Sequence, residues 1–527
     1  MDNGISKIPG NPDGGVMTEL YSGTLMSEDS TDYIVPEYIP DTGKILLCTA
    51  SPKIDGKFTD GGSVGIEGTV YFSLLLAGED GTVSGLSFSE PFSAKAAVDG
   101  LDDDCTVSLV PSVGYVTARL VNPRKIGVRC QINTDIRVFC CSPVGLTVKG
   151  AENVADEAGI RKKTVTAGTA DITAFEERGI AVSQDIELDG SFPQIGEMIL
   201  CRVRLNPAEV RVGDSGADTR TDALVSCIYR SDSGNCVSAD RKFTLEHHMD
   251  IPADGGREWT AYVFPSPAAA KVTPNSYGEM KVIELDFTYD LGITGMKNRE
   301  VALVSDVYST DYETAVETGE KNITVFGRCF TCGLSLNASA AKSEINAEDA
   351  VSVFTGSVNT KDVTAHYDPG KRKLITEGDA EITAVYTAGE DGGNFGRAVF
   401  TSHFRCETDA PDSLPADGFI ISCSAGDTRF RSDPQNIYCD TELSLRVTSL
   451  GSRTVVYTAS VTLDRDSPAV HADSAMTLYY PVSGESLFDI AKHYRVTDES
   501  IMTANRMTDC TADGRKVLII PAFEGAS

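Results

Sequence analysis

The sequence lacks any apolar run long enough to cross a bilayer. The longest runs, such as Val70–Ala77, fall far short of the roughly 20 residues that a membrane-spanning helix needs. The first 20 residues hold one Lys, two Pro and four Gly, but no apolar stretch of the kind found in secretory signals. We therefore expect no transmembrane segment, and we expect the chain to stay in the cytoplasm of the cell that makes it.

Basic residues are also scarce. Lys and Arg number 46 against 77 Asp and Glu, which gives a net charge of −31 and an isoelectric point near 4.5. Such a surface repels phosphate backbones and anionic lipids. Nucleic acid is therefore not an expected partner.

Histidine occurs only six times, without the paired spacing of a zinc site. The segment Gly213–Gly216 reads Gly-Asp-Ser-Gly, as around the nucleophile of trypsin-like proteases. Every histidine follows it, the reverse of the order in that family, so a polar hairpin turn is the better interpretation. The acidic run Leu101–Asp104 lacks the ligand order of a calcium loop and is interpreted as solvated. The sequence predicts no catalytic residue, cofactor or metal ligand, and no enzyme.

The fourteen cysteines are spread along the chain, and Cys329–Cys332 is the one Cys-x-x-Cys segment. Metal or redox chemistry there would need a second pair or a suitable fold around it. In a reducing cytoplasm, most of the cysteines are expected to be small buried apolar residues.

What the sequence does contain is an internal repeat. Apolar residues make up 41% of the 527 positions, enough for several cores, and this length predicts three or four domains. Pro40–Cys48 matches Pro193–Cys201 at an offset of 153 residues. Ala77–Gly81 matches Ala388–Gly392 at an offset of 311 residues, about two periods. Three copies of one unit explain both spacings.

The local pattern within each unit predicts strands. Runs of β-branched and aromatic residues, such as Thr69–Phe72 and Ile382–Thr387, are closed by Gly and Asp turns. The expected fold is mainly β, with three antiparallel β-sandwich-like repeats and a small α+β (βααβ) module. The expected ranges are a flexible tail at 1–30, repeats at 31–150, 175–320 and 324–466, and the module at 476–524. Protease-sensitive linkers are expected at 150–174, 310–321 and 467–476.

Three short motifs give the repeats a family resemblance. They are Val35-Pro36-Glu37 with Pro40-Asp41-x-x-Lys44-Ile45-Leu46, then Asn122-Pro123-Arg124-Lys125-Ile126, and Asp306-Val307-Tyr308-Ser309 in the second unit. With these motifs the repeats resemble the SPOCS family, also called DUF3794, of spore-coat-associated proteins in endospore formers.

The C-terminal segment changes pattern after Ser467–Ser474, where Pro and small polar residues predict a linker. A short strand, two capped helices with buried faces and a closing strand follow. The segment resembles a LysM domain through Tyr480, Gly484-Glu485-Ser486-Leu487, Ile490-Ala491, Asn505 and Ile520-Pro521. It departs from the LysM pattern at Glu485, where Asp is usual, at Phe488, a common Trp position, and by one extra residue between Gly514 and Pro521.

The resemblance implies a scaffold or adaptor in assembly of the spore envelope, coat and cortex. It implies a location in the mother-cell cytoplasm, at the coat basement layer on the forespore surface. The implied partners are a coat morphogenetic ATPase, bound through the LysM module, and other coat proteins. The alternative is a cell-wall protein that binds peptidoglycan or another glycan.

The expected partner-binding groove of the module comprises Gly484, Glu485, Ser486, Phe488, Asn505, Met507 and Asp509. Among these, Glu485, Phe488, Met507 and Asp509 are expected to be exposed, and an aromatic residue beside a Met suits a protein contact as well as a sugar. Leu487 and Ile490 are expected in the core of the module.

Overall fold

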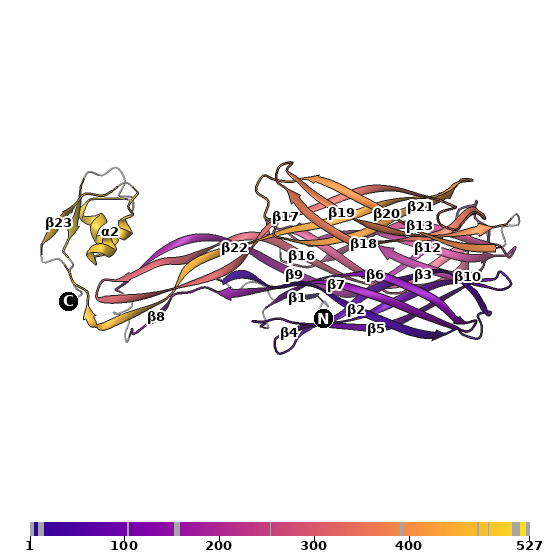
Figure 1. Cartoon of the computed structure of the whole chain (residues 1–527), viewed down its shortest axis with the longest axis horizontal. Coiled ribbons are helices and arrows are strands. Elements are labelled where there is room, and N and C mark those ends of the chain that lie inside the picture. Colours follow the sequence, from indigo (N-terminus) through magenta and orange to yellow (C-terminus); the bar gives the residue numbers. More distant parts are fainter. Residues whose placement is uncertain are drawn as a thin grey trace.

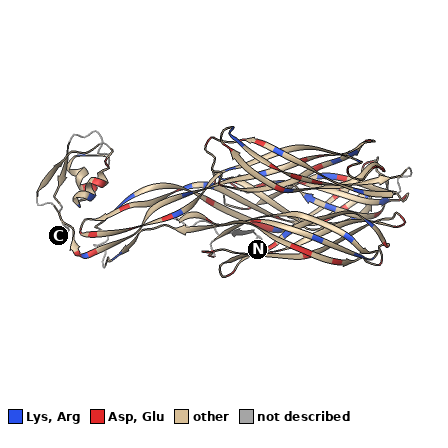
Figure 2. Ribbon diagram, in the orientation of Figure 1, with Lys and Arg blue, Asp and Glu red and all other residues tan. Residues whose placement is uncertain are grey.

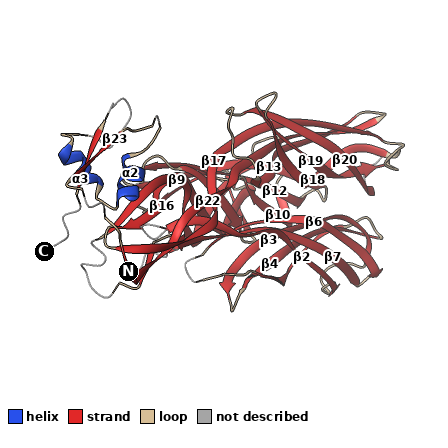
Figure 3. Ribbon diagram, turned by 60° about the vertical axis from the view of Figure 1, so that its left-hand side comes forward, coloured by secondary structure: helices blue, strands red, loops and turns tan. Residues whose placement is uncertain are grey.

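The computed structural model describes residues 5–8, 15–102, 105–151, 159–252, 254–389, 394–471, 474–482, 484–508 and 517–522. Its regular structure is almost entirely strand, and the helices in these ranges lie near the C-terminus (Figure 3). The strands pair antiparallel, with one short exception. The expected mainly β, antiparallel fold is confirmed at this level.

The first unit is a pair of three-stranded sheets. Leu74, Ile126 and Ile132 are fully buried in the core between them, and alternate residues of the strands point to this core and away from it. One sheet has the order β2 (Gly15–Ile34), β7 (Lys125–Pro143), β6 (Thr106–Asn122), and the other is the meander β3 (Thr42–Thr59), β4 (Ser63–Gly78), β5 (Val83–Ala97).

The second unit repeats this order with interrupted strands. Val225, Tyr229 and Ile283 lie in its core. One sheet contains β9 (Ile160–Glu187), β16 (Met280–Ser309), β14 (Glu258–Pro265) and β15 (Ala269–Pro274), and β1 (Ile5–Ile8) pairs with β9. The other sheet contains β10 (Ile195–Leu205), β12 (Gly216–Ser231), β13 (Cys236–Met249) and β11 (Glu209–Gly213).

The third unit again pairs its first long strand with its last. Ala380, Ile382 and Leu443 lie in its core. One sheet has the order β17 (Tyr312–Ala341), β22 (Asn436–Pro468), β21 (Gly418–Ser432), and the other is the meander β18 (Ala350–Asp368), β19 (Lys373–Ala388), β20 (Asn394–Asp409). The short strand β8 (Thr147–Lys149), which follows the first unit in sequence, pairs parallel with β22.

The three units share apolar clusters, which join them into one elongated body (Figure 1). One cluster takes Leu75 from the first unit, Ile228 from the second and Val385 from the third. A second cluster packs Met17 and Phe139 of the first unit against strands of the other two. Each Å² of apolar surface removed from water stabilises the folded state by about 25 cal/mol, so these shared clusters favour the association of the three units.

An arm leaves the body, formed by the far ends of β9, β16, β17 and β22 together with β8, and it carries the C-terminal module at its tip (Figure 1). Its own apolar cluster includes Ile160, Val307 and Val461. A strand of 30 residues such as β16 spans about 100 Å at about 3.3 Å per residue. The same strand can therefore contribute to the core of the body and still reach the module.

Several predicted domain boundaries are wrong because single long strands run through them. Residues 15–30, expected in a flexible tail, belong to β2, where Val16 and Met17 are buried. The expected linkers at 150–174 and 310–321 fall largely on β9 and β17, whose ladders with β16 and β22 continue into the arm. Residues 1–4 and 9–14 of the expected tail lie outside the described residues.

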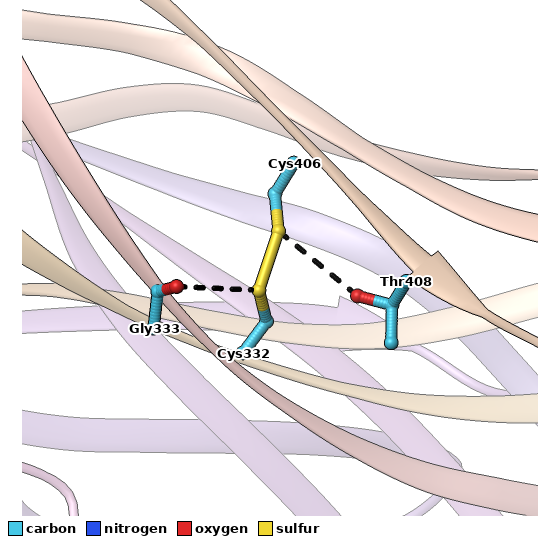
Figure 4. The surroundings of a disulfide bond; sticks show 4 residues. All are labelled: Cys332, Gly333, Cys406 and Thr408. Carbon is cyan, nitrogen blue, oxygen red and sulfur yellow. Dashed lines mark hydrogen bonds between the residues drawn. A yellow bond between two sulfur atoms is a disulfide. The ribbon is translucent and has the colours of Figure 1, made fainter.

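The cysteines are mostly unpaired thiols, as expected, and many of them are buried. One pair departs from that expectation, because Cys332 on β17 and Cys406 on β20 form a disulfide between the two sheets of the third unit (Figure 4). The other cysteine of the Cys-x-x-Cys segment, Cys329, contacts Thr448 instead. The segment therefore does not act as a ligand pair.

Candidate partner-binding module

The C-terminal module is built from four short elements. They are β23 (Met476–Tyr479), α2 (Leu487–Tyr494), α3 (Asp498–Ala504) and β24 (Leu518–Pro521), and β23 pairs antiparallel with β24. The Ser486 hydroxyl caps α2 by accepting from the Asp489 amide at 3.2 Å, and Thr497 caps α3 in the same way. Each such cap contributes about 1 kcal/mol to helix stability.

The core of the module is small and is completed by the arm. Leu487 and Ile490 are buried in it, as the sequence predicts. Tyr308, near the end of β16, is fully buried in the same cluster. Its hydroxyl donates to the Val496 carbonyl oxygen at 2.7 Å, and its ring meets the Phe488 ring edge-on at 5.1 Å between centroids. Burial raises the pKa of Tyr308, so the phenol stays neutral as a donor.

Ion pairs surround the Tyr308 contact. Lys492 of α2 lies 2.7 Å from Asp306, Arg495 pairs with Glu313, and Lys163 of β9 lies 3.1 Å from Asp489. Hydrogen bonds from Ser486 and then Lys163 hold the pKa of the Asp489 carboxyl below its usual value. These pairs are partly exposed, so each contributes at most about 1 kcal/mol. Their role is to orient α2 on the arm.

Two of the predicted groove residues face the arm. Phe488 is half-buried between Tyr308 and the Lys163 ammonium group, which lies 5.7 Å from the centroid of its ring. The Ser486 hydroxyl also lies 3.2 Å from Lys163. The expectation that Phe488 is free for a partner does not fit this contact.

Other predicted residues hold the module together. Glu485 is half-buried and accepts from the Tyr479 hydroxyl at 2.6 Å, a bond that raises the pKa of Tyr479 to about 12. The Asn505 amide donates to the Ile519 carbonyl and accepts from the Ile519 amide, which ties α3 to β24. Met507 is only 8% exposed, so its expected exposure is wrong. The remaining two residues are Gly484, which is exposed with a φ of 86°, and Asp509, which lies outside the described residues.

The large exposed apolar surface of the module lies on β23 and on the residues that directly follow it. Met476, Leu478 and Tyr480 alternate with inward residues and expose 59%, 57% and 70% of their surface. The ladder sets Leu478 opposite Ile519 and Met476 opposite Pro521. Val482 is also exposed, at 69%. A clue was present in the sequence, because Met-Thr-Leu-Tyr-Tyr puts apolar side chains on both faces of a strand, whereas a small module buries only one.

The Gly213–Gly216 segment forms the predicted hairpin turn, between β11 and β12. His248 lies beside it, with Nδ1 2.7 Å from Asp218 and Nε2 3.1 Å from the carbonyl oxygen of Ser215. The Nε2 atom of His248 would have to accept the proton of the Ser215 hydroxyl, but it contacts the backbone carbonyl oxygen of Ser215 instead. This arrangement is not that of a nucleophile and its base.

One potential metal-ligand group was missed from the sequence. The Cys105 and Cys140 thiols lie 3.4 and 3.3 Å from the same Asp102 carboxylate oxygen. Burial raises the pKa of both thiols, which favours hydrogen bonding to the carboxylate over thiolate formation. Structural zinc sites use four protein ligands, whereas this group supplies three.

No protein-family model, curated protein or solved structure matches this chain. In the part of the chain that the structure describes, no helix has the length and apolar character needed to cross a membrane.

Proposed function

We propose that the chain is a non-enzymatic scaffold in assembly of the spore envelope, and that its LysM-like module binds a coat morphogenetic ATPase. The observation that carries this proposal is the exposed apolar face of the module, at Met476, Leu478, Tyr480 and Val482, on the far tip of the arm. A contiguous exposed apolar patch is typical of a protein-binding surface.

The pairing order of the strands supports three SPOCS-like repeats. In each unit the first long strand pairs with the last, and intervening strands form the opposite sheet, three in the first and third units and four in the second. Two of the motifs that carry the family resemblance also meet in space. Arg124 donates to the Val35 and Pro36 carbonyl oxygens at 3.1 and 2.8 Å, and also to that of Ile39. The motif residues thus have a structural reason to occur together.

The order of three such repeats and one LysM-like module resembles that of the clostridial spore morphogenetic protein SipL. By this resemblance we place the chain in the mother-cell cytoplasm, at the coat basement layer on the forespore surface. The body and arm would then recruit other coat proteins. The internal roles of Glu485 and Asn505 support a protein partner over a glycan, because their polar groups already bond within the module.

The test is a binding titration of the full chain with a purified coat morphogenetic ATPase. Tyr480→Ser and Leu478→Ser each remove an exposed apolar contact without touching the core of the module. Loss of an interface hot spot costs about 2 kcal/mol, so we expect affinity to fall about thirtyfold. Val470→Ser is the matched control, because Val470 is 83% exposed but precedes the module, and it should leave affinity unchanged.

Undiminished ATPase binding by both sheet-face variants would reject this surface as the binding site. Titration with peptidoglycan fragments separates the alternative function. Tight glycan binding, lost in Tyr480→Ser, together with no ATPase binding would instead identify a wall-binding protein.

A further inference from the structure

A large cavity lies at the centre of the body, where the meander sheets of the three units face one another. Its volume is about 940 Å³. Its walls come mainly from β3 to β5 in the first unit, from β10, β12 and β13 in the second, and from β18 to β21 in the third. Ligand sites in proteins commonly have volumes of roughly 300 to 1,000 Å³. The cavity is therefore large enough for a small organic molecule.

The wall from the second unit is cationic. The strand register places Arg202 beside Ser226 and Asp240 in one row across the sheet, and Arg204 beside Leu224 and Lys242 in the next row. All six of these residues line the cavity. Cys201 and Cys227, one position along, pack into the core of the unit. The alternation of side chains along a strand thus directs both arginines to the cavity.

The walls from the other two units are mostly neutral and rich in hydroxyl groups. The first unit contributes Thr49, Ser73 and Ser87 as one row across its sheet. The third unit contributes Ser357 and Thr383, and also Arg397 of β20. The cavity therefore combines guanidinium groups with many hydroxyl donors.

Three of the arginines that line the cavity form no ion pair. Among the described residues, Arg202, Arg204 and Arg397 make no ion pair and no side-chain hydrogen bond, and the Arg202 Nε is buried without an acceptor. The other three lining cations are compensated, since Arg241 pairs with Asp189 at 3.1 Å, Lys242 with Asp222 at 2.7 Å and Arg429 with Asp427 at 3.5 Å.

The surroundings destabilise the charged forms of Arg202 and Arg204. Burial, and then the nearby Arg204, lower the pKa of Arg202 to about 10, while Asp240 opposes this shift. Desolvation by the surrounding protein also lowers the pKa of Arg204.

Of the three lining carboxylates, Glu381 pairs with Lys361 and Asp427 with Arg429, which leaves Asp240 near the unpaired arginines. The cavity therefore has an excess of positive charge in a chain whose net charge is −31 and whose acidic and basic residues are spread along the strands of the body (Figure 2). Arg202 is partly buried, whereas Arg204 and Arg397 are exposed, so their guanidinium groups are accessible to an anion that enters the cavity.

We propose that the central cavity binds a small, multiply charged oxyanion, a phosphate ester or polycarboxylate, through Arg202, Arg204 and Arg397. Each guanidinium group can donate two parallel N–H bonds to two oxygens of a planar carboxylate or a tetrahedral phosphate group. The hydroxyl rows would donate to its remaining oxygens. The site is separate from the module, so its occupancy does not depend on the partner of the LysM-like face.

The test is thermal unfolding and calorimetric titration of the full chain with pyrophosphate, inorganic phosphate and citrate, each against sodium chloride of equal ionic strength. We expect at least one of the three anions to bind and to raise the midpoint of unfolding beyond the salt control. Binding by the phosphates alone indicates a phosphate ester, and binding by citrate alone indicates a polycarboxylate.

The variant for this test is the double change Arg202→Gln and Arg204→Gln, which should weaken binding about tenfold or more because it removes two charged donors. Without anion, the same variant should unfold at a higher temperature than the parent, because two uncompensated charges are gone. Arg119→Gln on β6 is the matched control, since Arg119 is an exposed arginine outside the cavity and should change neither result. Arg397→Gln, from a different sheet, is a second test if the double variant does not fold.

The proposal is overturned if no anion stabilises the chain beyond sodium chloride, or if binding persists unchanged in both cavity variants.

Discussion

The body and the C-terminal module bury their apolar side chains in different ways. Each unit of the body closes its own core between two sheets and then shares apolar clusters with its neighbours. The module has less than fifty residues and buries Tyr308 of the arm within its core. Small domains bury too little apolar surface to be robust alone. We therefore expect the stability of the module to depend on the arm, and that of the body not to depend on the module.

The largest effect on the stability of the module is expected from Tyr308→Ala. Truncation of a large buried aromatic residue costs about 3–5 kcal/mol. We expect the α2 and α3 amides to lose that much protection in hydrogen exchange while the core strands of the body keep theirs. Tyr308→Phe keeps the ring but removes the bond to Val496, so its effect should be about 1 kcal/mol. Tyr277→Ala, at an 86% exposed tyrosine, is the control and should change neither region. Equal loss in body and module after Tyr308→Ala would contradict the comparison.

A smaller effect is expected from the ion pairs at the same contact. Asp306→Asn removes the partner of Lys492 and should weaken protection of α2 by about 1 kcal/mol at low salt. Because the pair is partly exposed, the difference from the parent should shrink at 1 M salt. A difference that is independent of salt would show that packing, and not charge, is lost. Asp412→Asn provides a control, because its pair with Arg372 is exposed and lies in the third unit.

The smallest effect concerns pH. The folded-state pKa of Asp489 is lowered, so the stability it provides is fully present above its unfolded pKa, roughly 4, and is lost as pH falls through the lower folded value. The group is nearly half exposed, so the loss should be under about 1 kcal/mol. Hydrogen exchange of α2 between pH 6 and 3 should show it, and Asp489→Asn should flatten the dependence. An unaltered pH profile in that variant would assign the effect to other carboxylates.

The local structure of the chain was largely predictable from sequence. Alternation and turn residues indicated the strands, the Gly213–Gly216 turn was identified, and the helical spacing of Leu487 and Ile490 placed both in a core. The strand β2 was missed because its outer half alternates polar residues such as Ser22 and Asp32 with modest apolar ones, a pattern that also fits a solvated tail.

The candidate site was much less predictable. Phe488 and Ser486 were identified from local spacing, but spacing cannot reveal a contact with Tyr308 or Lys163, which lie far away in sequence. Met507 is a residue that suits either a surface patch or a core, and the fold of the module decides between them. Arg202 and Arg204 follow the ordinary alternation of a strand with one solvent-facing side. The sequence does not reveal that the sheets of the other two units lie opposite them.

The continuous strands of the arm also determine how the molecule would carry force. A load applied at the module passes along the chain into β22, and through the Tyr308 contact into β16, and it runs along the arm parallel to the strands. The backbone hydrogen bonds between β9 and β16, and between β17 and β22, are then sheared together, whereas a load at right angles would open them one after another. The arm should therefore resist extension along its strands more strongly than a flexible tether of the same length.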